Sequence, residues 1–369
     1  MIFVMAGGGT GGHVIPAIAV ARELTRAGHE ARFVGTDRGV ESRLVPAAGF
    51  RLDKIRVGGM KNLGVLTRLM SLWRLLAETV GQWREFGRLH PAAVFSMGGY
   101  VAGPPVLAAL VRGVPVVVME PNAVPGATNR WISRWVRRAL ISFEETRRFF
   151  PKDRTELTGL PVRDEFFAIP ARQPAGEFTV LITGGSQGSR TLNEAARASW
   201  PRFRESGLPV RFLLQTGIPM YEELKRDFAA SGLPGDVVPF INDMPAAFAQ
   251  ADLIVCRSGA GAVSELAAAG KPSVLVPFPF AADDHQTKNA EVLQRAGAAV
   301  LSSDKDWTGE RFFEIAGNLA AAPERLREMR NAARALAKPG SARRAAEILM
   351  AEAAKASKNV DSTGPGPKQ

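Results

Sequence analysis

The sequence holds one cysteine, Cys256, in 369 residues, and only four histidines, which are scattered. A single cysteine excludes an intramolecular disulfide, and its apolar neighbours predict a buried strand around it. No apolar run approaches the roughly 18 residues of a membrane-spanning helix, and no charged segment precedes an apolar core near Met1. We therefore expect no signal peptide, no membrane span and a reducing, cytoplasmic setting.

Acidic residues are few beside the basic ones: 36 Asp and Glu stand against 47 Lys and Arg, for a net charge of +11. This excess favours an anionic partner, whether nucleic acid, an acidic membrane surface or a phosphorylated substrate. The sequence has no zinc-finger spacing and no aromatic RNA-binding motif, which argues against nucleic acid.

Glycine is concentrated near the N-terminus in Gly7-Gly8-Gly9-Thr10-Gly11-Gly12-His13, between an apolar run and an amphipathic segment. We expect a strand, a glycine turn and a helix from Val14 to Ala27. The backbone amides of such a turn and the positive end of the helix favour a phosphate. The spacing also fits a plain tight turn, and it fits the dinucleotide fingerprint with Asp37 placed to bind a ribose.

A second copy of the pattern lies near the middle of the chain, where Gly184-Gly185-Ser186-Gln187-Gly188 follows an apolar run. Strand-like and helix-like segments alternate on both sides of a linker at Thr158–Arg163, which predicts parallel sheets covered by helices. We therefore predict two Rossmann-like domains that aim glycine loops at a shared cleft. A further pair, Gly98 and Gly99, is expected to line that cleft. The predicted parts are residues 1–162, residues 163–340, a helix at 341–356 and a disordered tail at 357–369.

The segment from Leu63 to Leu89 has a helical pattern with an apolar face and flanking arginines. Two interpretations are open, and both can hold for different residues of the helix: this face packs on the sheet, or part of it lies on an anionic bilayer. The face includes Trp73, Leu76, Val80 and Trp83. A second basic and aromatic stretch contains Trp131 and Trp135, for which we expect packing in the core with the arginines in solvent. The alternative is that this stretch contributes to the membrane-facing charge.

In the second half, Cys256-Arg257-Ser258-Gly259 ends a strand-like run and leads into a helix whose first turns hold Glu265. Small residues at a helix N-terminus again favour a phosphate, and a carboxylate in the next turns can accept hydrogen bonds from both hydroxyls of a ribose. The same acid equally fits a role in compensating the helix dipole.

Together these runs resemble the MurG family of bacterial peptidoglycan glycosyltransferases, and they occur in order from residue 1 to about residue 355. The matching segments are Gly8–His13, Met97–Tyr100, Asn122–Asn129, Pro161–Arg163, Gly184–Gly188, Asp243-Met244, Cys256–Gly259, Ser264-Glu265, and Gln286 with Asn289.

The resemblance implies an α/β fold of the GT-B type, in which the C-terminal helix returns to the first of two Rossmann-like domains. It implies an inverting transfer of N-acetylglucosamine from UDP-GlcNAc to undecaprenyl-pyrophosphoryl-MurNAc-pentapeptide (lipid I), which gives lipid II for peptidoglycan. The expected setting is peripheral, on the cytoplasmic face of the plasma membrane. The expected partners are therefore UDP-GlcNAc, lipid I and an anionic membrane surface, without nucleic acid.

Site residues also follow from the resemblance. The UDP-GlcNAc-binding residues are expected to be Thr10, Gly11, Gly12, Asn122, Arg163, Ser186, Ile241, Glu265 and Gln286. The loops at Gly8, Gly9, Gly98 and Gly99 would receive the acceptor pyrophosphate. The expected membrane contact consists of Trp73, Leu76, Val80 and Trp83.

An inverting displacement needs a base for the acceptor hydroxyl and stabilisation of the departing UDP. His13 is the candidate catalytic base, because it lies at a loop–helix junction and imidazole titrates near neutrality. Its alternative role, to position a phosphate or cap the helix, stays open. Asp283 and Asp284 are a poor substitute for a metal-clamping Asp-x-Asp cluster. We expect Arg163 and helix dipoles to stabilise the leaving group, with no metal and no cofactor.

Four residues depart from the family pattern: Met119, Pro121, Leu160 and His285 stand where histidine, glutamine, asparagine and glutamine are usual. Three other functions remain to be weighed. A nicotinamide-dependent oxidoreductase would use the first glycine loop and Asp37, but it leaves the second loop unexplained. A basic membrane scaffold would bind the UDP-sugar without turnover. A glycosyltransferase of the same fold would act on a different acceptor.

Overall fold

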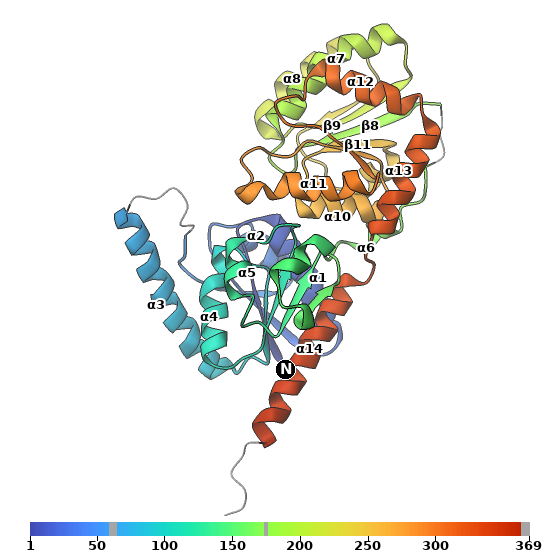
Figure 1. Cartoon of the computed structure of the whole chain (residues 1–369). Coiled ribbons are helices and arrows are strands. Elements are labelled where there is room, and N and C mark those ends of the chain that lie inside the picture. The colour runs from blue at the N-terminus through green and yellow to red at the C-terminus, as the bar shows by residue number, and fades with distance from the viewer. Residues whose placement is uncertain (59–64, 173–175, 363–369) are drawn as a thin grey trace, which may run out of the picture. The chain divides into compact units, whose positions relative to one another are not determined.

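The computed structural model describes residues 1–58, 65–172 and 176–362, without the side chains of residues 65–69 and 359–362. The chain forms two compact units, one of Met1–Val162 with the segment that starts at Gly340, and one of Arg163–Pro339. Each unit is a sheet with helices packed against it (Figure 1), and all strand pairs in the described part of the chain are parallel.

The sheet of the first unit has the strand order β3-β2-β1-β4-β5-β6-β7. Its order reverses between β1 and β4, which is where ligands bind in doubly wound folds, beyond the carboxyl ends of the strands. The strands are β1 (Ile2–Ala6), β2 (Glu30–Gly35), β3 (Arg51–Lys54), β4 (Ala93–Ser96), β5 (Val116–Glu120), β6 (Arg138–Ile141) and β7 (Thr155–Leu157). The helices are α1 (Gly11–Arg26), α2 (Glu41–Ala47), α3 (Val65–Leu89), α4 (Gly103–Val111), α5 (Ala127–Ile132) and α14 (Ser341–Ser362), with short 3-10 turns η1 (Tyr100–Ala102), η2 (Glu144–Phe149) and η3 (Lys152–Arg154).

The sheet of the second unit has the order β10-β9-β8-β11-β12-β13, and it reverses between β8 and β11. Its strands are β8 (Phe178–Thr183), β9 (Val210–Gln215), β10 (Gly235–Val238), β11 (Leu253–Cys256), β12 (Ser273–Leu275) and β13 (Ala299–Leu301). Its helices are α6 (Asp164–Phe167), α7 (Arg190–Ser206), α8 (Tyr221–Ser231), α9 (Met244–Gln250), α10 (Ala260–Ala269), α11 (His285–Arg295), α12 (Gly309–Ala320) and α13 (Pro323–Leu336), with 3-10 turns η4 (Ile218–Met220) and η5 (Ala282–Asp284).

The central strands are apolar because helices bury both faces of each sheet. All residues of β5 and β11 are buried. In the second unit an aromatic cluster joins sheet and helices: the Phe203 ring of α7 lies 5.2 Å from the Phe212 ring of β9 and 5.7 Å from the Phe312 ring of α12. Rigid sheets of this kind hold the loops at their carboxyl ends in fixed positions.

Helix α3 packs along α4, where Leu75 lies against Gly103, and Phe86 enters the core. Trp73 is 72% exposed and Leu76 is 51% exposed. Val80 and Trp83 are exposed on the same helix, and the Arg112 guanidinium lies 4.2 Å from the centre of the Trp83 ring. Packing of these four side chains on the sheet, one of the two interpretations of the sequence, is therefore wrong. Residues 63 and 64 of the predicted helix lie outside the described part.

The expected core packing of Trp131 and Trp135 is also wrong, because their side chains are 58% and 54% exposed. The two rings lie 5.6 Å apart at the surface. Ile132 and Val136, each one residue further along, occupy the core positions instead.

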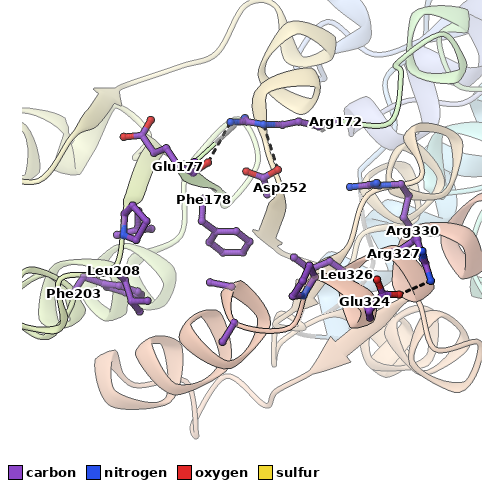
Figure 2. Close-up of a pocket in the computed structure, with 16 residues that line it drawn as sticks. Arg172, Glu177, Phe178, Phe203, Leu208, Asp252, Glu324, Leu326, Arg327 and Arg330 are labelled. Carbon is purple, nitrogen blue, oxygen red and sulfur yellow. Dashed lines mark hydrogen bonds and ion pairs between the residues drawn. The ribbon is translucent and has the colours of Figure 1, made fainter. Parts of the chain in front are cut away.

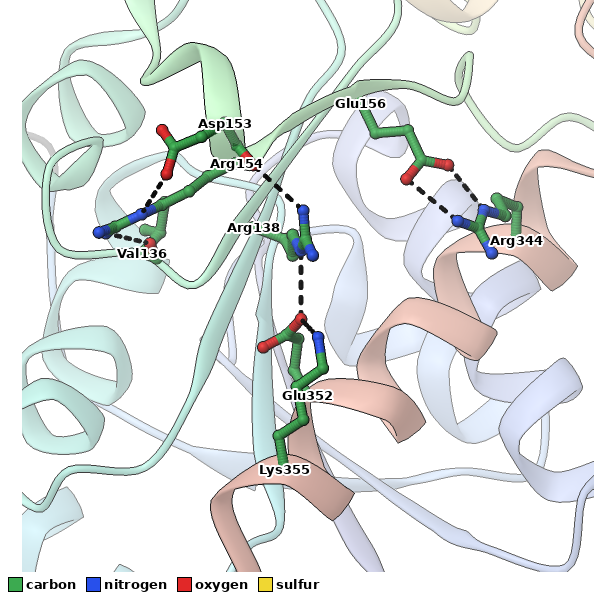
Figure 3. A network of polar contacts seen from close by, with 8 residues as sticks. All are labelled: Val136, Arg138, Asp153, Arg154, Glu156, Arg344, Glu352 and Lys355. Carbon is green, nitrogen blue, oxygen red and sulfur yellow. Dashed lines mark hydrogen bonds and ion pairs between the residues drawn. The ribbon is translucent and has the colours of Figure 1, made fainter. Parts of the chain in front are cut away.

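Helix α14 follows the second unit in sequence but belongs to the first. Figure 3 shows its ties to the last strands of that sheet: Glu352 accepts a hydrogen bond from Arg138 at 3.1 Å and from Lys355 at 2.8 Å. Arg344 donates to both carboxylate oxygens of Glu156, at 2.6 and 3.1 Å. These pairs fix the helix against β6 and β7.

The structure differs from the sequence predictions at one end of α1 and of α14 and in the additional strand β7. Helix α1 begins at Gly11 rather than Val14, because the backbone is extended at Thr10 and turns helical directly after it. Strand β7 was not predicted, because it has three residues of which only Leu157 is apolar, and it pairs only with β6 at the sheet edge. Helix α14 continues to Ser362, since no glycine or proline occurs before Gly364. The predicted tail is therefore helical at 357–362, and residues 363–369 lie outside the described part.

Candidate active site

The first glycine loop lies between β1 and α1, and a buried carboxylate on α2 determines its shape. The Gly9 amide donates to Glu41 Oε2 at 2.8 Å. The Thr36 amide and hydroxyl donate to Glu41 Oε1 at 2.9 and 2.7 Å. Burial of Glu41 opposes ionisation, but these hydrogen bonds outweigh it and lower the pKa of the carboxyl. A Cβ on Gly8 would collide with this carboxylate and displace it from the loop amides, which favours glycine there.

His13 lies in the first turn of α1, beside the same loop. Its Nδ1–H donates to the Gly8 carbonyl oxygen at 3.2 Å. Because a carbonyl oxygen only accepts, the proton sits on Nδ1 and the basic lone pair is on Nε2. Gly99, with φ of +75°, comes so close that a Cβ there would lie 3.5 Å from the imidazole ring. The structure thus brings the two predicted glycine loops of this unit together around His13.

The Asn122 loop, after β5, is held by a second buried carboxylate. Glu120 accepts from the amides of Asn122 at 2.9 Å and Gly126 at 3.2 Å, and from the Asn129 side chain at 3.0 Å. Burial raises the pKa of Glu120 to about 7, against the effect of these donors. Thr128 donates to the Gly99 carbonyl at 3.1 Å, which ties this loop to the second glycine loop.

These loops follow β1, β4 and β5, which are neighbours at the switch point of the first sheet. In helix α1 no side chain caps the N-terminus, and Thr10 and Gly12 are exposed. The backbone amides and the positive helix end therefore face outward, which suits an anion such as a diphosphate.

In the second unit, Gln215 at the end of β9 joins two predicted site segments. Its side chain donates to the Gly185 carbonyl at 2.7 Å and accepts from the Ile241 amide at 3.0 Å. Gly188 has φ of +76°, and a Cβ there would collide with the Thr216 carbonyl. This close packing leaves Ser186 exposed at the tip of the loop.

A second set of contacts positions Gln286 at the start of α11. Its side-chain oxygen accepts from the Phe278 amide at 2.9 Å. Its backbone carbonyl accepts from the Ser258 hydroxyl at 2.8 Å. Asn289 donates to the Ser258 carbonyl at 3.2 Å. The loops after β11 and β12 therefore form one connected structure.

Glu265 lies on α10, half-buried, and Arg163 at the start of α6 is close enough to act on it electrostatically. Burial raises the pKa of Glu265 to about 7, although the Arg163 charge lowers it. The carboxyl therefore titrates near neutral pH. A ligand hydroxyl that donates to the carboxylate favours its ionised form.

Sequence reasoning missed Glu41 and Gln215 as site residues, and it treated Glu120 only as part of a motif. Glu41 and Gln215 touch loop atoms distant in sequence, so no local pattern marks these two residues. Asp37, the candidate for a dinucleotide ribose, is exposed. In the described part of the chain, no group of three or more His, Cys, Asp or Glu residues could hold a metal ion. No helix among the described residues is both long and apolar enough to cross a bilayer.

Two family models together match most of the chain. The glycosyltransferase family 28 N-terminal domain matches residues 3–141, and the C-terminal domain of that family matches residues 179–347. The chain therefore belongs to glycosyltransferase family 28, and it is a hexosyltransferase of the two-domain GT-B type.

Comparison with single proteins shows which members of this family the chain resembles strongly in sequence and in structure. The chain is 63% identical over 347 residues to the UDP-N-acetylglucosamine--N-acetylmuramyl-(pentapeptide) pyrophosphoryl-undecaprenol N-acetylglucosamine transferase of Solibacter usitatus (strain Ellin6076), covering 94% of this chain and 95% of the relative. It is 40% identical over 354 residues to the protein of the same name from Myxococcus xanthus (strain DK1622), covering 95% of this chain and 92% of that relative. The crystal structure of Acinetobacter baumannii MurG matches with a TM-score of 0.80 at 33% identity, over 95% of this chain and 99% of that one. The predicted fold class and resemblance to MurG are confirmed.

We predict that Glu41→Gln loosens the first glycine loop. Glutamine has one acceptor oxygen, so its NH2 group must face the Gly9 or the Thr36 amide, at a cost of about 1–3 kcal/mol. Hydrogen exchange at the Gly9 amide should accelerate about tenfold or more. The control is Glu23→Gln, a partly exposed carboxylate on α1 that pairs with Arg26 and does not contact the loop. Unchanged exchange at Gly9 in Glu41→Gln would contradict this role for Glu41.

Proposed function

We propose that this chain transfers N-acetylglucosamine from UDP-GlcNAc to undecaprenyl-pyrophosphoryl-MurNAc-pentapeptide, forming lipid II with inversion at the anomeric carbon. The observation that carries the proposal is 63% identity, across nearly the whole chain, to a protein named for this transfer. The identity to relatives named for this transfer confirms the function predicted from the sequence. The roles of single residues are proposals, argued below from their contacts.

The second unit provides most of the donor site. Glu265 accepts hydrogen bonds from the ribose hydroxyls, and the Ile241 backbone binds the uracil end. The amides of Gly184–Gly188, with the exposed Ser186 hydroxyl, bind the diphosphate, and Arg163 balances its charge. Gln286 contacts the sugar through its amide NH2, because its oxygen is held by Phe278.

The first unit provides the acceptor site. The loops at Gly8–Gly9 and Gly98–Gly99 bind the acceptor pyrophosphate through backbone amides. Thr10, Gly11, Gly12 and Asn122 are also proposed to bind UDP-GlcNAc. The shape of these loops depends on the carboxylates of Glu41 and Glu120.

His13 acts as the general base through Nε2. It takes the proton of the muramoyl hydroxyl while that oxygen forms a bond to the anomeric carbon. The bond from this carbon to the UDP oxygen breaks, and UDP leaves with the electron pair. The Nδ1–H bond to Gly8 fixes the tautomer needed for this step. Arg163 and the helix N-termini stabilise the charge on the departing diphosphate.

The exposed face of α3 is the proposed membrane contact. Trp73, Leu76, Val80 and Trp83 present apolar side chains to solvent, and the chain carries a net charge of +11. Such a surface attracts an anionic leaflet and inserts at its interface. We place the protein on the cytoplasmic face of the plasma membrane as a peripheral enzyme, where its lipid-linked acceptor is accessible.

The transfer itself is tested with purified protein, UDP-GlcNAc and a short-chain lipid I analogue. We expect UDP release only in the presence of the acceptor, with one β-linked disaccharide formed for each UDP. If UDP-GlcNAc binds but no disaccharide forms, the proposed acceptor is wrong and the proposed donor site is still supported. Binding of NAD(H) in place of UDP-GlcNAc would contradict the donor site.

UDP-GlcNAc affinity should rise with pH. The ionised Glu265 accepts from the ribose hydroxyls, so binding favours the carboxylate and weakens as Glu265 protonates below its pKa of about 7. We expect an affinity gain of about tenfold between about pH 6 and about pH 8, measured by calorimetry. Glu265→Gln should bind weakly with a flat profile, whereas Glu291→Gln on α11 should retain the wild-type profile. A pH dependence that persists in Glu265→Gln excludes Glu265 as its origin.

Replacing Trp73 and Trp83 with serine should reduce binding to anionic liposomes by about tenfold or more, because two large apolar side chains no longer enter the interface. Turnover of a water-soluble acceptor analogue should remain near wild type. Ile218→Ser in the second unit, where Ile218 is 82% exposed, is the control for loss of an exposed apolar side chain. Equal loss of liposome binding and turnover would mean that these tryptophans support the fold instead.

A further inference from the structure

A cavity of about 450 Å³ lies in the second unit at the edge opposite its glycine loop. Phe178 and Val210 begin β8 and β9, and Asp252 directly precedes β11, so these lining residues are at the amino ends of the strands. The loop at Gly184–Gly188 follows the carboxyl end of β8. The cavity is therefore separate from the proposed donor site. Its volume is in the range of small-molecule sites, which is roughly 300–1,000 Å³.

The body of the cavity is apolar. Phe178, Leu208 and Leu326 line it, and each is only half-buried, so their side chains retain surface for a ligand to cover. The buried Phe203 ring belongs to the aromatic core behind them. A hydrocarbon chain or ring would gain free energy here by leaving water.

Three arginines line the cavity, and two of them are neutralised by acids. Arg172 pairs with Asp252 at 3.3 Å, and Arg327 pairs with Glu324. Figure 2 draws these contacts, while Arg330 has no drawn partner. Within the described part of the chain, no acidic side chain forms an ion pair with Arg330. The carboxylate of Glu177 lies at the far end of the cavity from it in Figure 2.

The surroundings of Arg330 add positive charge. Lys271 is 3% exposed and donates to the Ala251 carbonyl at 2.7 Å. The pKa of Lys271 is lowered to about 8, chiefly by burial and then by the charge of Arg330, with smaller contributions from Arg172 and Arg334 and an opposing effect of Asp252. An anion beside Arg330 would relieve this repulsion. A guanidinium offers two parallel N–H donors to a carboxylate or a phosphate.

We propose that this cavity binds a single-chain amphiphile, whose anionic carboxylate or phosphate head pairs with Arg330 and whose apolar chain lies against Phe178, Leu208 and Leu326. The charge and the apolar surface are both needed, so neither a bare anion nor a neutral amphiphile satisfies the site. The cavity thus constitutes a second ligand site, independent of sugar transfer.

The test is calorimetric titration of the full chain with octyl phosphate and with octanoate, in saturating UDP so that the donor site is blocked. Two control compounds separate the contributions. Inorganic phosphate supplies the anionic head without an apolar chain, and octyl glucoside supplies the apolar chain with a neutral head. We expect at least one of the two anionic amphiphiles to bind, and the two control compounds to bind much more weakly. The amphiphile that binds identifies the preferred head group.

Arg330→Gln should weaken that binding by about tenfold or more, since it removes a charge-assisted hydrogen bond. Arg325→Gln is the matched control on α13, where Arg325 pairs with Glu328 and does not line the cavity. The double variant Trp73→Ser, Trp83→Ser should bind as wild type. The proposal is overturned if neither amphiphile binds, if Arg330→Gln binds as tightly as Arg325→Gln, or if the tryptophan variant loses binding, which would place the amphiphile on α3.

Discussion

A phosphate-binding loop must point its amides at a ligand and still keep its shape, and here buried polar side chains from neighbouring elements meet that constraint. Glu41 holds the Gly9 amide, Glu120 holds the Asn122 loop, and Gln215 joins Gly185 to Ile241. Each side chain satisfies backbone donors or acceptors that would otherwise be unpaired on the protein side. The outward-facing amides are thereby fixed before any ligand arrives, which is what electrostatic stabilisation of a diphosphate requires.

The two carboxyls with raised pKa values differ in what they touch. Glu120 receives several backbone and side-chain donors, so its ionised form is fully hydrogen-bonded inside the protein. Glu265 is influenced chiefly by burial and by Arg163. A half-buried acid without strong internal donors gains most from ligand hydroxyls. This contrast supports a structural role for Glu120 and a ligand-binding role for Glu265.

The alternation of apolar strands and amphipathic helices was sufficient to predict the parallel sheets, because strands such as β8, β9 and β11 are buried on both faces. The same logic failed at β7, whose residues lack that pattern, and at Trp131 and Trp135, where aromatic character alone suggested burial. Glycine loops were visible because few residues tolerate their geometry. The partners that hold these loops were not visible, since Glu41 meets Gly9 only after α2 packs against α1. Assignment of single residues to donor or acceptor relied on the family resemblance.

The most direct test of the account is the turnover of His13→Ala, measured as acceptor-dependent UDP release with a short-chain lipid I analogue. UDP-GlcNAc affinity is measured on the same protein. We predict a fall in kcat of about 10²–10⁴-fold with donor affinity near wild type, because the variant loses the base and keeps the donor site. A kcat close to wild type would contradict His13 as the base. A fall in kcat/KM that matches the lost donor affinity, with kcat near wild type, would show instead that His13 positions the phosphates.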